Sequence, residues 1–242
     1  MATALALKNV SKSFGAIHIA TGLDLVVGDN EAVGVLGPNG AGKTTILGLI
    51  AGTLALDAGS IEFQGRDISR LPTHERCRLG IARAYQVPQP FSDMTVFENL
   101  MVAACFGARQ GLVAAQSHCL ETLDTCGLSG LADIRAGRLT LLDRKRLELA
   151  RALASRPKLL LLDEIAGGLT QHECDELVAL IRNVHATGIT IVWIEHVLHA
   201  LLSVVSRALV LHQGRFIADG DPREVIRDPR VAEIYMGIEA DA

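Results

Sequence analysis

The 242-residue sequence has few aromatic residues, no excess of basic charge and no long apolar segment, and each shortage excludes a class of protein. Phe, Trp and Tyr make up 4% of the chain, so aliphatic side chains must form most of its core. The formal net charge is −4, which lacks the basic excess of nucleic-acid-binding proteins, and we expect no nucleic-acid partner. The longest apolar stretches, Leu100–Ala104 and Val197–Leu211, are too short or too often interrupted by polar residues to span a bilayer.

Cysteine is also scarce, with five residues and no C-x-x-C pair, at Cys77, Cys105, Cys119, Cys126 and Cys174. An odd number without that spacing argues against a disulfide framework or a structural zinc site, and it fits reduced thiols in the cytosol. The first residues, Met1–Lys8, have neither the basic region nor the apolar run of a secretory signal. We therefore expect any membrane role to depend on a partner protein.

The N-terminal part of the chain has the pattern of short strands followed by a helix. Residues 3–35 contain partly alternating apolar positions and glycine turns, and Glu31–Leu36 is a strand that enters a glycine-rich turn. The segment Thr44–Ala51 is expected to be a helix that ends at Gly52, and Ser60–Phe63 another short strand.

The middle of the chain, from about residue 87 to residue 155, has a mostly helical pattern. Thr95–Glu98 has the sequence of a capping box, and Leu112–Cys126 and Arg144–Ser155 are further helical candidates. We interpret this stretch as a helical lobe inserted into an α/β core.

Alternating strands and helices resume after Pro157. Leu159–Leu162 and Ile189–Ile194 are continuous apolar runs, as expected of parallel strands buried on both faces. Between them, Thr170–Glu173 is a second capping box before an amphipathic helix. Two more helix starts are predicted where aspartate precedes proline, at Asp221-Pro222 and Asp228-Pro229.

A phosphate-binding loop is predicted at Gly37-Pro-Asn-Gly-Ala-Gly-Lys-Thr44, which matches G-x-x-x-x-G-K-[ST] in full. An ordinary glycine turn is the alternative, but the preceding strand and following helix supply the context that the motif needs. Main-chain N–H groups and the helix N-terminus would bind the phosphates, Lys43 would reach the β- and γ-phosphates, and Thr44 would bind Mg²⁺. The predicted nucleotide contacts here are Gly37, Pro38, Asn39, Gly40, Ala41, Gly42, Lys43, Thr44 and Thr45.

Two acidic residues follow the buried strand Leu159–Leu162. Ligands collect at the carboxyl ends of strands in open α/β sheets, so Asp163 is a candidate to bind Mg²⁺ through water. Glu164 is a candidate general base for the attacking water. A strand that simply ends in solvated acids is the alternative, which the nearby phosphate loop disfavours. The two motifs together predict a nucleoside triphosphatase.

Other residues give the chain a resemblance to the ATP-binding subunits of ABC transporters along nearly its whole length. Gln86, in Arg83-Ala-Tyr-Gln86, stands at the family's glutamine loop, which touches Mg²⁺ and the attacking water. His196 follows a strand, as does the family's switch histidine at the γ-phosphate, and Phe14 matches the aromatic residue that stacks on adenine. On local pattern alone, a histidine after a strand is more often structural, and a core residue is nearly as good a reading of Phe14.

The family's signature, usually L-S-G-G-Q, corresponds to Leu139-Thr140-Leu141-Leu142-Asp143. Leucines replace both glycines and aspartate replaces glutamine, which removes the close backbone approach that glycine permits. By resemblance, Leu139, Thr140 and Asp143 face the nucleotide of a second subunit, and the Thr140 hydroxyl can still bond its γ-phosphate. Ile165 also departs from the proline common after the family's catalytic glutamate.

The resemblance implies an α/β fold with a P-loop NTPase core, that is, a mixed sheet with helices on both sides and an antiparallel β edge. The core would comprise residues 1–86 and 156–242, and residues 87–155 would form the helical subdomain with the signature. ATP and Mg²⁺ are the implied nucleotide and metal. The implied partners are transmembrane permease subunits, a second ATPase subunit and, indirectly, a substrate-binding protein. The chain would lie on the cytoplasmic face of the membrane as a peripheral protein.

Three segments resemble the larger ATPase of branched-chain amino-acid importers, namely Arg83–Leu100, Arg144–Leu153 and Gly220–Gly237. Relatives of that subgroup also serve urea, amides and aromatic acids, so the cargo stays open. A homodimer and a heterodimer with a paralogous ATPase are both possible, and the unusual signature favours the heterodimer.

Two other classes remain as alternatives. A non-transport ABC ATPase acting on DNA or ribosomes would carry long coiled coils or two fused ATPase domains, and the sequence has no sustained heptads. A scaffold that binds ATP without hydrolysing it is disfavoured by the intact Asp163, Glu164 and His196, although the altered signature keeps it open.

Overall fold

The computed structural model describes residues 2–236, which fold into two compact units. The first unit combines the N-terminal segment to Leu71 with the C-terminal segment from Thr190, and the second unit runs from Pro72 to Ile189. Gly237, the last residue of the tail that resembles the importer ATPases, lies outside the described residues.

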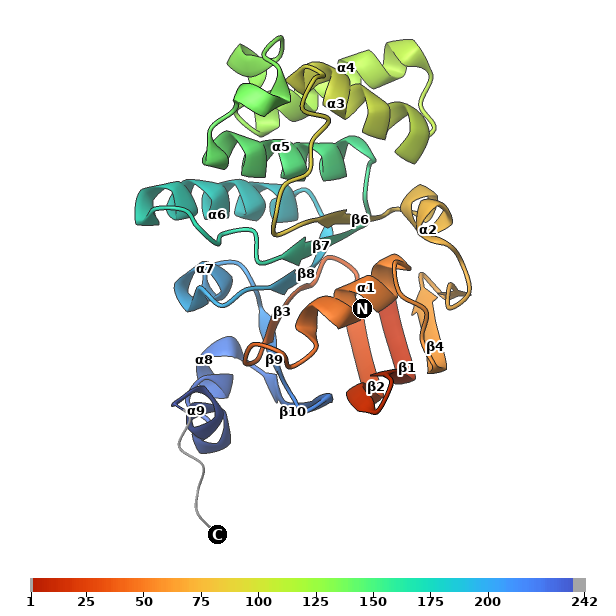
Figure 1. Cartoon of the computed structure of the whole chain (residues 1–242), viewed down its shortest axis with the longest axis vertical. Helices are drawn as coiled ribbons and strands as arrows, with labels where there is room; N and C mark the ends of the chain where they lie inside the picture. Colours follow the sequence, from red (N-terminus) through yellow and green to blue (C-terminus); the bar gives the residue numbers. More distant parts are fainter. Residues whose placement is uncertain (1, 237–242) are drawn as a thin grey trace. The chain divides into compact units, whose positions relative to one another are not determined.

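The first unit contains an antiparallel sheet with the strand order β2-β1-β4-β5. Its strands are β1 (Thr3–Phe14), β2 (Ile17–Gly28), β4 (Ala58–Phe63) and β5 (Arg66–Asp67). Leu5, Leu7 and Val10 of β1 are buried, as their alternation in the sequence predicts. This sheet is the expected antiparallel edge, visible beside α1 in Figure 1.

The same unit also holds a mainly parallel sheet. Strand β3 (Ala32–Leu36) pairs in parallel with β8 (Thr190–Ile194) and with β9 (Arg207–His212), and β10 (Arg215–Gly220) is antiparallel to β9. Every residue of β3 and β8 is buried. A Cβ on Gly34 would lie 2.7 Å from a methyl group of Leu201, so a glycine there lets α7 (Leu198–Leu202) pack on β3.

Three further helices belong to this unit. Helix α1 (Lys43–Ala51) follows β3 and ends at Gly52, as predicted, and the φ of 79° at Gly52 lies in the left-handed region that favours glycine. Asp221 caps α8 (Pro222–Val225) by accepting a hydrogen bond from the Arg223 N–H, and α9 (Pro229–Met236) follows. The aspartate–proline pairs therefore start helices as expected.

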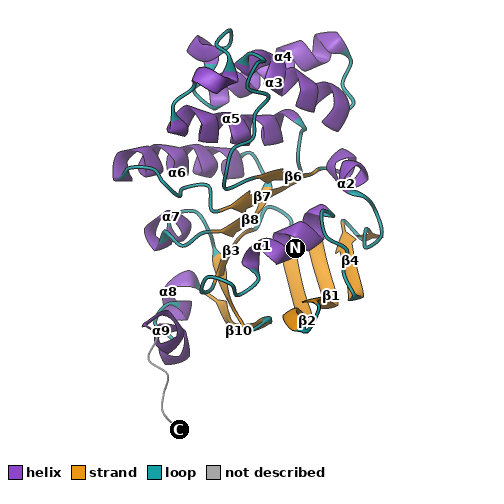
Figure 2. Cartoon of the chain, in the orientation of Figure 1, coloured by secondary structure: helices purple, strands orange, loops and turns teal. Residues whose placement is uncertain are grey.

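The second unit consists of two parallel strands and a set of helices (Figure 2). Strand β6 (Ile81–Ala84) pairs with β7 (Leu159–Asp163). The α-helices are α2 (Thr73–Leu79), α3 (Val96–Val102), α4 (Leu112–Thr125), α5 (Leu141–Ala154) and α6 (Gln171–Ala186), and a short π-helix spans Ala103–Gly107. Helices α3, α4 and α5 contact one another.

Both predicted capping boxes are present, at Thr95 with Glu98 and at Thr170 with Glu173. Helix α5 begins at Leu141, three residues before the expected start, because Thr140 caps it and the leucines that replace the signature glycines continue the helix. Among residues 2–236, no helix combines the length and the apolar content needed to cross a bilayer.

Candidate functional site

The predicted phosphate loop connects β3 to α1 and depends on glycine at defined positions. Gly37, Gly40 and Gly42 have φ angles of 152°, 82° and 99°, in the left-handed region that favours glycine. A Cβ on Gly37 would lie 2.3 Å from the Leu211 carbonyl oxygen, and one on Gly42 would lie 2.6 Å from a methyl group of Ile19. The loop is therefore shaped by close contacts with neighbouring strands that no larger residue tolerates.

Lys43 is the first residue of α1 and is only 6% exposed. Its Nζ donates hydrogen bonds to the carbonyl oxygens of Gly37 at 2.8 Å and Pro38 at 3.1 Å, so the ammonium group lies within its own loop. Thr44 is exposed, and the first turn of α1 contains no acidic residue of its own to oppose the positive end of the helix dipole. These features suit a phosphate chain, which needs many donors at short range.

Two more predicted residues lie in the first unit. Phe14 is 47% exposed and the Lys12 ammonium lies 5.3 Å from its ring centroid, so Phe14 is not a core residue and its ring is open to stacking. His196 follows β8 and its side chain is 54% exposed. Its N–H donates to the buried carboxylate of Glu195 at 3.0 Å, which fixes the turn that presents the imidazole.

The acidic pair lies in the second unit. Asp163 is the last residue of β7 and is buried, and Glu164 follows with a φ of 46°. A non-glycine residue in this region is strained, and such strain is concentrated at functional sites. The Gln86 amide donates to Glu164 Oε2 at 2.8 Å. The structure thus brings together the predicted general base and the predicted glutamine-loop residue.

Arg83 and Lys145 also contact the predicted site residues of the second unit, although the sequence did not predict either as a site residue. Arg83 Nη2 donates to Asp163 Oδ2 at 2.5 Å, and the buried Lys145 donates from Nζ to the Gln86 carbonyl at 2.7 Å. A signal existed for Arg83, because it is the one charged residue in the otherwise apolar strand β6. Nothing local marks Lys145, since its partner is 59 residues away.

The signature segment forms the start of α5. Leu139 and Leu142 are buried, whereas Leu141 is 46% exposed. Thr140 Oγ1 accepts from the Asp143 N–H at 3.2 Å and donates to Asp143 Oδ2 at 2.7 Å. The hydroxyl that the resemblance assigns to a γ-phosphate is therefore already bonded to a carboxylate.

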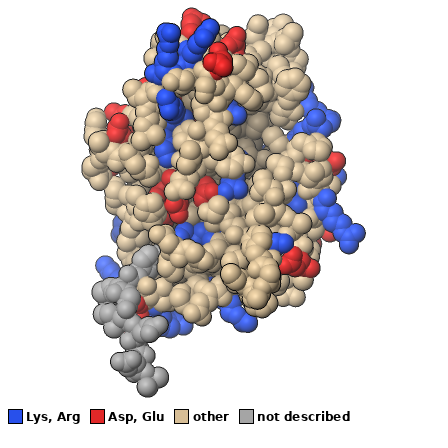
Figure 3. Space-filling view, viewed as in Figure 1, with Lys and Arg blue, Asp and Glu red and all other residues tan. Residues whose placement is uncertain are grey.

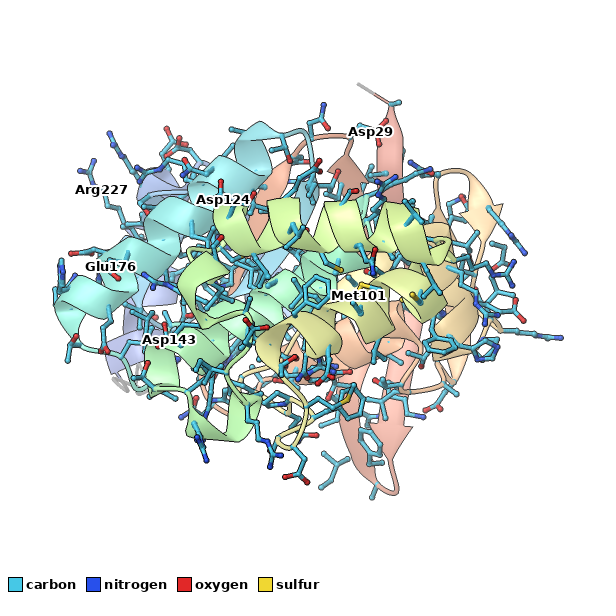
Figure 4. The ribbon with its side chains drawn as sticks, turned by 90° about the horizontal axis from the view of Figure 1, so that it is seen from above. Asp29, Met101, Asp124, Asp143, Glu176 and Arg227 are labelled. Atoms are coloured by element: carbon cyan, nitrogen blue, oxygen red, sulfur yellow. The ribbon has the colours of Figure 1, made fainter. Side chains whose placement is uncertain are left out.

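Asp143 is in turn part of a charge chain on α5 and α6, where Figure 4 labels Asp143 and Glu176. Arg146 lies 3.6 Å from Asp143 and 2.6 Å from Glu176, measured between nitrogen and oxygen atoms. Charged side chains of both signs also occur on the face in Figure 3, among larger areas of uncharged residues. The two ion pairs of Arg146 therefore connect α5 to α6.

The predicted metal contacts are oxygen donors, from the Thr44 hydroxyl, the Asp163 carboxylate and the Gln86 side chain. Hard oxygen donors suit Mg²⁺, which keeps several waters and usually takes further oxygens from substrate phosphates. Within residues 2–236, no three His, Cys, Asp or Glu side chains form a group that could hold a metal by themselves. The chemistry of each predicted donor, taken within its own unit, therefore fits a magnesium ion that arrives with a nucleotide.

The chain is similar to families and proteins of one kind. Residues 20–167 match the family described as ABC transporter, and residues 217–241 match the branched-chain amino acid ATP-binding cassette transporter family. The lipopolysaccharide export ATP-binding protein LptB of Acidithiobacillus ferridurans is 35% identical over 237 residues, covering 98% of each chain. The high-affinity branched-chain amino acid transport ATP-binding protein LivG of Salmonella typhimurium is 35% identical over 250 residues, covering 96% of this chain and 97% of LivG.

The fold also matches solved structures. The ADP conformation of MJ1267, an ATP-binding cassette of an ABC transporter, superimposes with a TM-score of 0.89 and 31% identity. The match covers 98% of this chain and 100% of MJ1267. The predicted α/β fold with a P-loop NTPase core is confirmed by this likeness and by the mixed strands and helices described above.

Proposed function

Because the chain belongs to the ATP-binding subunits of ABC transporters and is an ATPase, we propose that it drives an importer of branched-chain amino acids or a related small polar or organic-acid substrate. The match of residues 217–241 to the branched-chain family carries the choice of cargo class. LivG and the BraF protein of Pseudomonas aeruginosa support the same choice.

In the proposed reaction, the loop from Gly37 to Thr45 binds the triphosphate through main-chain N–H groups, and Lys43 moves from its own carbonyls to the β- and γ-phosphates. Phe14 stacks on the adenine. A magnesium ion held by Thr44 and Asp163, with Gln86, would neutralise developing negative charge. Positioning and electrostatics of this kind supply most of the catalysis in phosphoryl transfer.

The same proposal assigns the water-activating role to Glu164. The hydrogen bond from Gln86 holds the Glu164 carboxylate in place, which supports a general base that must meet a water in one geometry. His196 contacts the γ-phosphate from the turn after β8. Residues 1–86 and 156–242 act as the catalytic core in this scheme, and residues 87–155 act as the helical subdomain.

The proposed partner in hydrolysis is a second, paralogous ATPase subunit. The hydrogen bond between Thr140 and Asp143 supports this choice, because it places a carboxylate where a facing γ-phosphate would need donors. A homodimer would carry this altered signature at both sites, whereas a heterodimer would carry it at one. Permease subunits would complete the assembly, with a substrate-binding protein acting through them. The chain would then sit on the cytoplasmic face of the membrane without spanning it.

A second candidate is an ATPase for lipopolysaccharide export, which the similarity to LptB from several bacteria favours. The two candidates share the ATPase chemistry and differ in the permeases and the cargo.

The ATPase assignment is tested by two variants. Glu164→Gln should bind Mg-ATP but lose at least about a hundredfold in turnover, because the general base is gone. Lys43→Ala should lose nucleotide affinity in equilibrium titration. Full hydrolysis by Glu164→Gln, or unchanged affinity in Lys43→Ala, would remove these residues from their proposed roles.

The cargo is tested by purifying a tagged chain with its bound membrane partners and reconstituting them in liposomes. A leucine-loaded substrate-binding protein should raise the ATPase rate, and lipopolysaccharide should not. The opposite response would replace the importer proposal by the export candidate.

A further inference from the structure

Arg83 makes a buried ion pair with the residue proposed to hold magnesium. Its Nη2 lies 2.5 Å from Asp163 Oδ2, and the two side chains are 8% and 5% exposed. Arg83 lies on β6 opposite Leu161 of β7, so its guanidinium reaches along the neighbouring strand to the point where β7 ends. The contact is therefore set by the register of two paired strands.

A second contact fixes the guanidinium group from another side. The Arg83 guanidinium carbon lies 4.6 Å from the centroid of the Tyr85 ring, which is within range of a cation–π interaction. Arginine presents a planar set of donors, so stacking on a ring and pairing with a carboxylate together define its orientation. The carboxylate that it pairs with is thereby restrained as well.

The buried ion pair between Arg83 and Asp163 is expected to contribute little to the stability of the fold. The desolvation of a buried ion pair offsets much of its attraction, and well-packed apolar residues often serve as well or better. The Arg83 Nε is also buried and has no hydrogen-bond partner among the described residues, which is itself unfavourable. Buried polar groups of this kind call for an explanation other than stability.

We propose that Arg83 is a positioning residue that holds the Asp163 carboxylate in the orientation in which it binds the magnesium ion of Mg-ATP. This inference rests on the proposed ATPase site. Groups that orient a metal-binding carboxylate typically change metal affinity by about tenfold to a hundredfold when removed. Arg83 therefore acts through Asp163 and contacts neither nucleotide nor metal.

The test measures ADP affinity by calorimetry with excess Mg²⁺ and again with EDTA, and the ratio of the two affinities is the magnesium effect. Arg83→Met should lower that ratio by about tenfold while ADP affinity in EDTA stays within about twofold of wild type. Arg83→Lys keeps the charge without the planar donors and should restore part of the ratio. Arg207→Met is the matched control, because it breaks the ion pair with Asp219 in the other unit and should leave the ratio unchanged.

A magnesium effect that is unchanged in Arg83→Met, or a loss of ADP affinity equal with and without Mg²⁺, would overturn the inference. If Arg83→Met fails to fold by circular dichroism, Tyr85→Leu takes its place, since it removes the ring contact at a half-exposed position. Tyr85→Leu should lower the ratio by about threefold, and no change would count against the inference. Failure of wild-type protein to bind ADP at all would instead contradict the proposed function.

Discussion

The thiol of Cys126 is buried at the C-terminal end of α4, and burial raises its pKa from 9.0 to about 12. In the unfolded chain the thiol ionises near its ordinary pKa of 9.0, whereas in the folded protein it stays protonated up to about pH 12. Ionisation of Cys126 therefore leaves stability unchanged below pH 9 and progressively favours the unfolded state as the pH rises to 12. Between pH 9 and 12 the unfolding free energy of wild type should therefore fall more steeply with pH than that of Cys126→Ala, by about 1.4 kcal/mol per pH unit. Urea denaturation at pH 9, 10 and 11 measures the difference.

The two proteins must be compared as slopes, because Cys126→Ala also removes packed volume and lowers stability at every pH. Parallel curves for wild type and Cys126→Ala would show that the folded thiol titrates with the unfolded one.

At the scale of single residues, local motifs predicted only part of the candidate site. Lys43 and Thr44 follow from one contiguous pattern, and Asp163 and Glu164 follow from a buried strand with acids at its end. The contact of Arg83 with Asp163 follows only from the pairing of β6 with β7. The contact of Lys145 with Gln86 follows only from the packing of α5 against the glutamine loop. Both depend on partners far away in the sequence, which no spacing rule encodes.

At the scale of elements, the capping box of α3 gives a direct test. Thr95 Oγ1 accepts from the Glu98 N–H at 3.1 Å, and Glu98 Oε2 accepts from the Thr95 N–H at 2.8 Å. Thr95→Ala removes the first bond and should lower the unfolding free energy by about 1 kcal/mol in urea denaturation. Thr95→Ser keeps the hydroxyl and should stay within about 0.5 kcal/mol of wild type. Equal losses in the two variants would assign the effect to the threonine methyl group.

The helices were predicted better than the strands of the C-terminal part. Capping boxes and αL glycines are local signals, so the starts of α3 and α6 and the end of α1 agree with the sequence. The expected start of α5 at Arg144 lies three residues too late, because the leucines that replace the signature glycines favour helix and extend it back to Leu141. Neither β9 nor β10 was predicted. The stretch Val197–Leu211 is mainly apolar with scattered polar residues, and it shows no period that separates a helix from strand β9.

At the scale of the whole molecule, the altered signature predicts two unequal sites in a complex with a paralogous ATPase. The triple change Leu141→Gly, Leu142→Gly and Asp143→Gln restores the usual residues and releases Thr140 from the Asp143 carboxylate. If each site contributes equally once completed, the ATPase rate of the reconstituted complex should rise by at most about twofold. The measurement is steady-state ATP hydrolysis per complex.

The single change Asp143→Gln serves as the control, because it removes the negative charge and keeps most of the first turn of α5. Asp143→Gln alone should give part of the increase in ATPase rate that is expected of the triple change. An unchanged rate in both variants, with folding verified by thermal denaturation, would show that the signature residues do not limit hydrolysis.

Gln86 is held at both of its ends. Its side-chain amide is bonded to Glu164, and its main-chain carbonyl is bonded to Lys145 of α5, while Arg151 of the same helix donates to the Gln89 carbonyl at 2.8 Å. The segment Gln86–Gln89 is therefore tied to α5 by two main-chain hydrogen bonds and to Glu164 by one side-chain hydrogen bond, so we expect a displacement of α5 to reach the carboxylate that is proposed to activate water. A movement of the proposed helical lobe would then shift the proposed general base, so that the position of the lobe and the rate of hydrolysis change together.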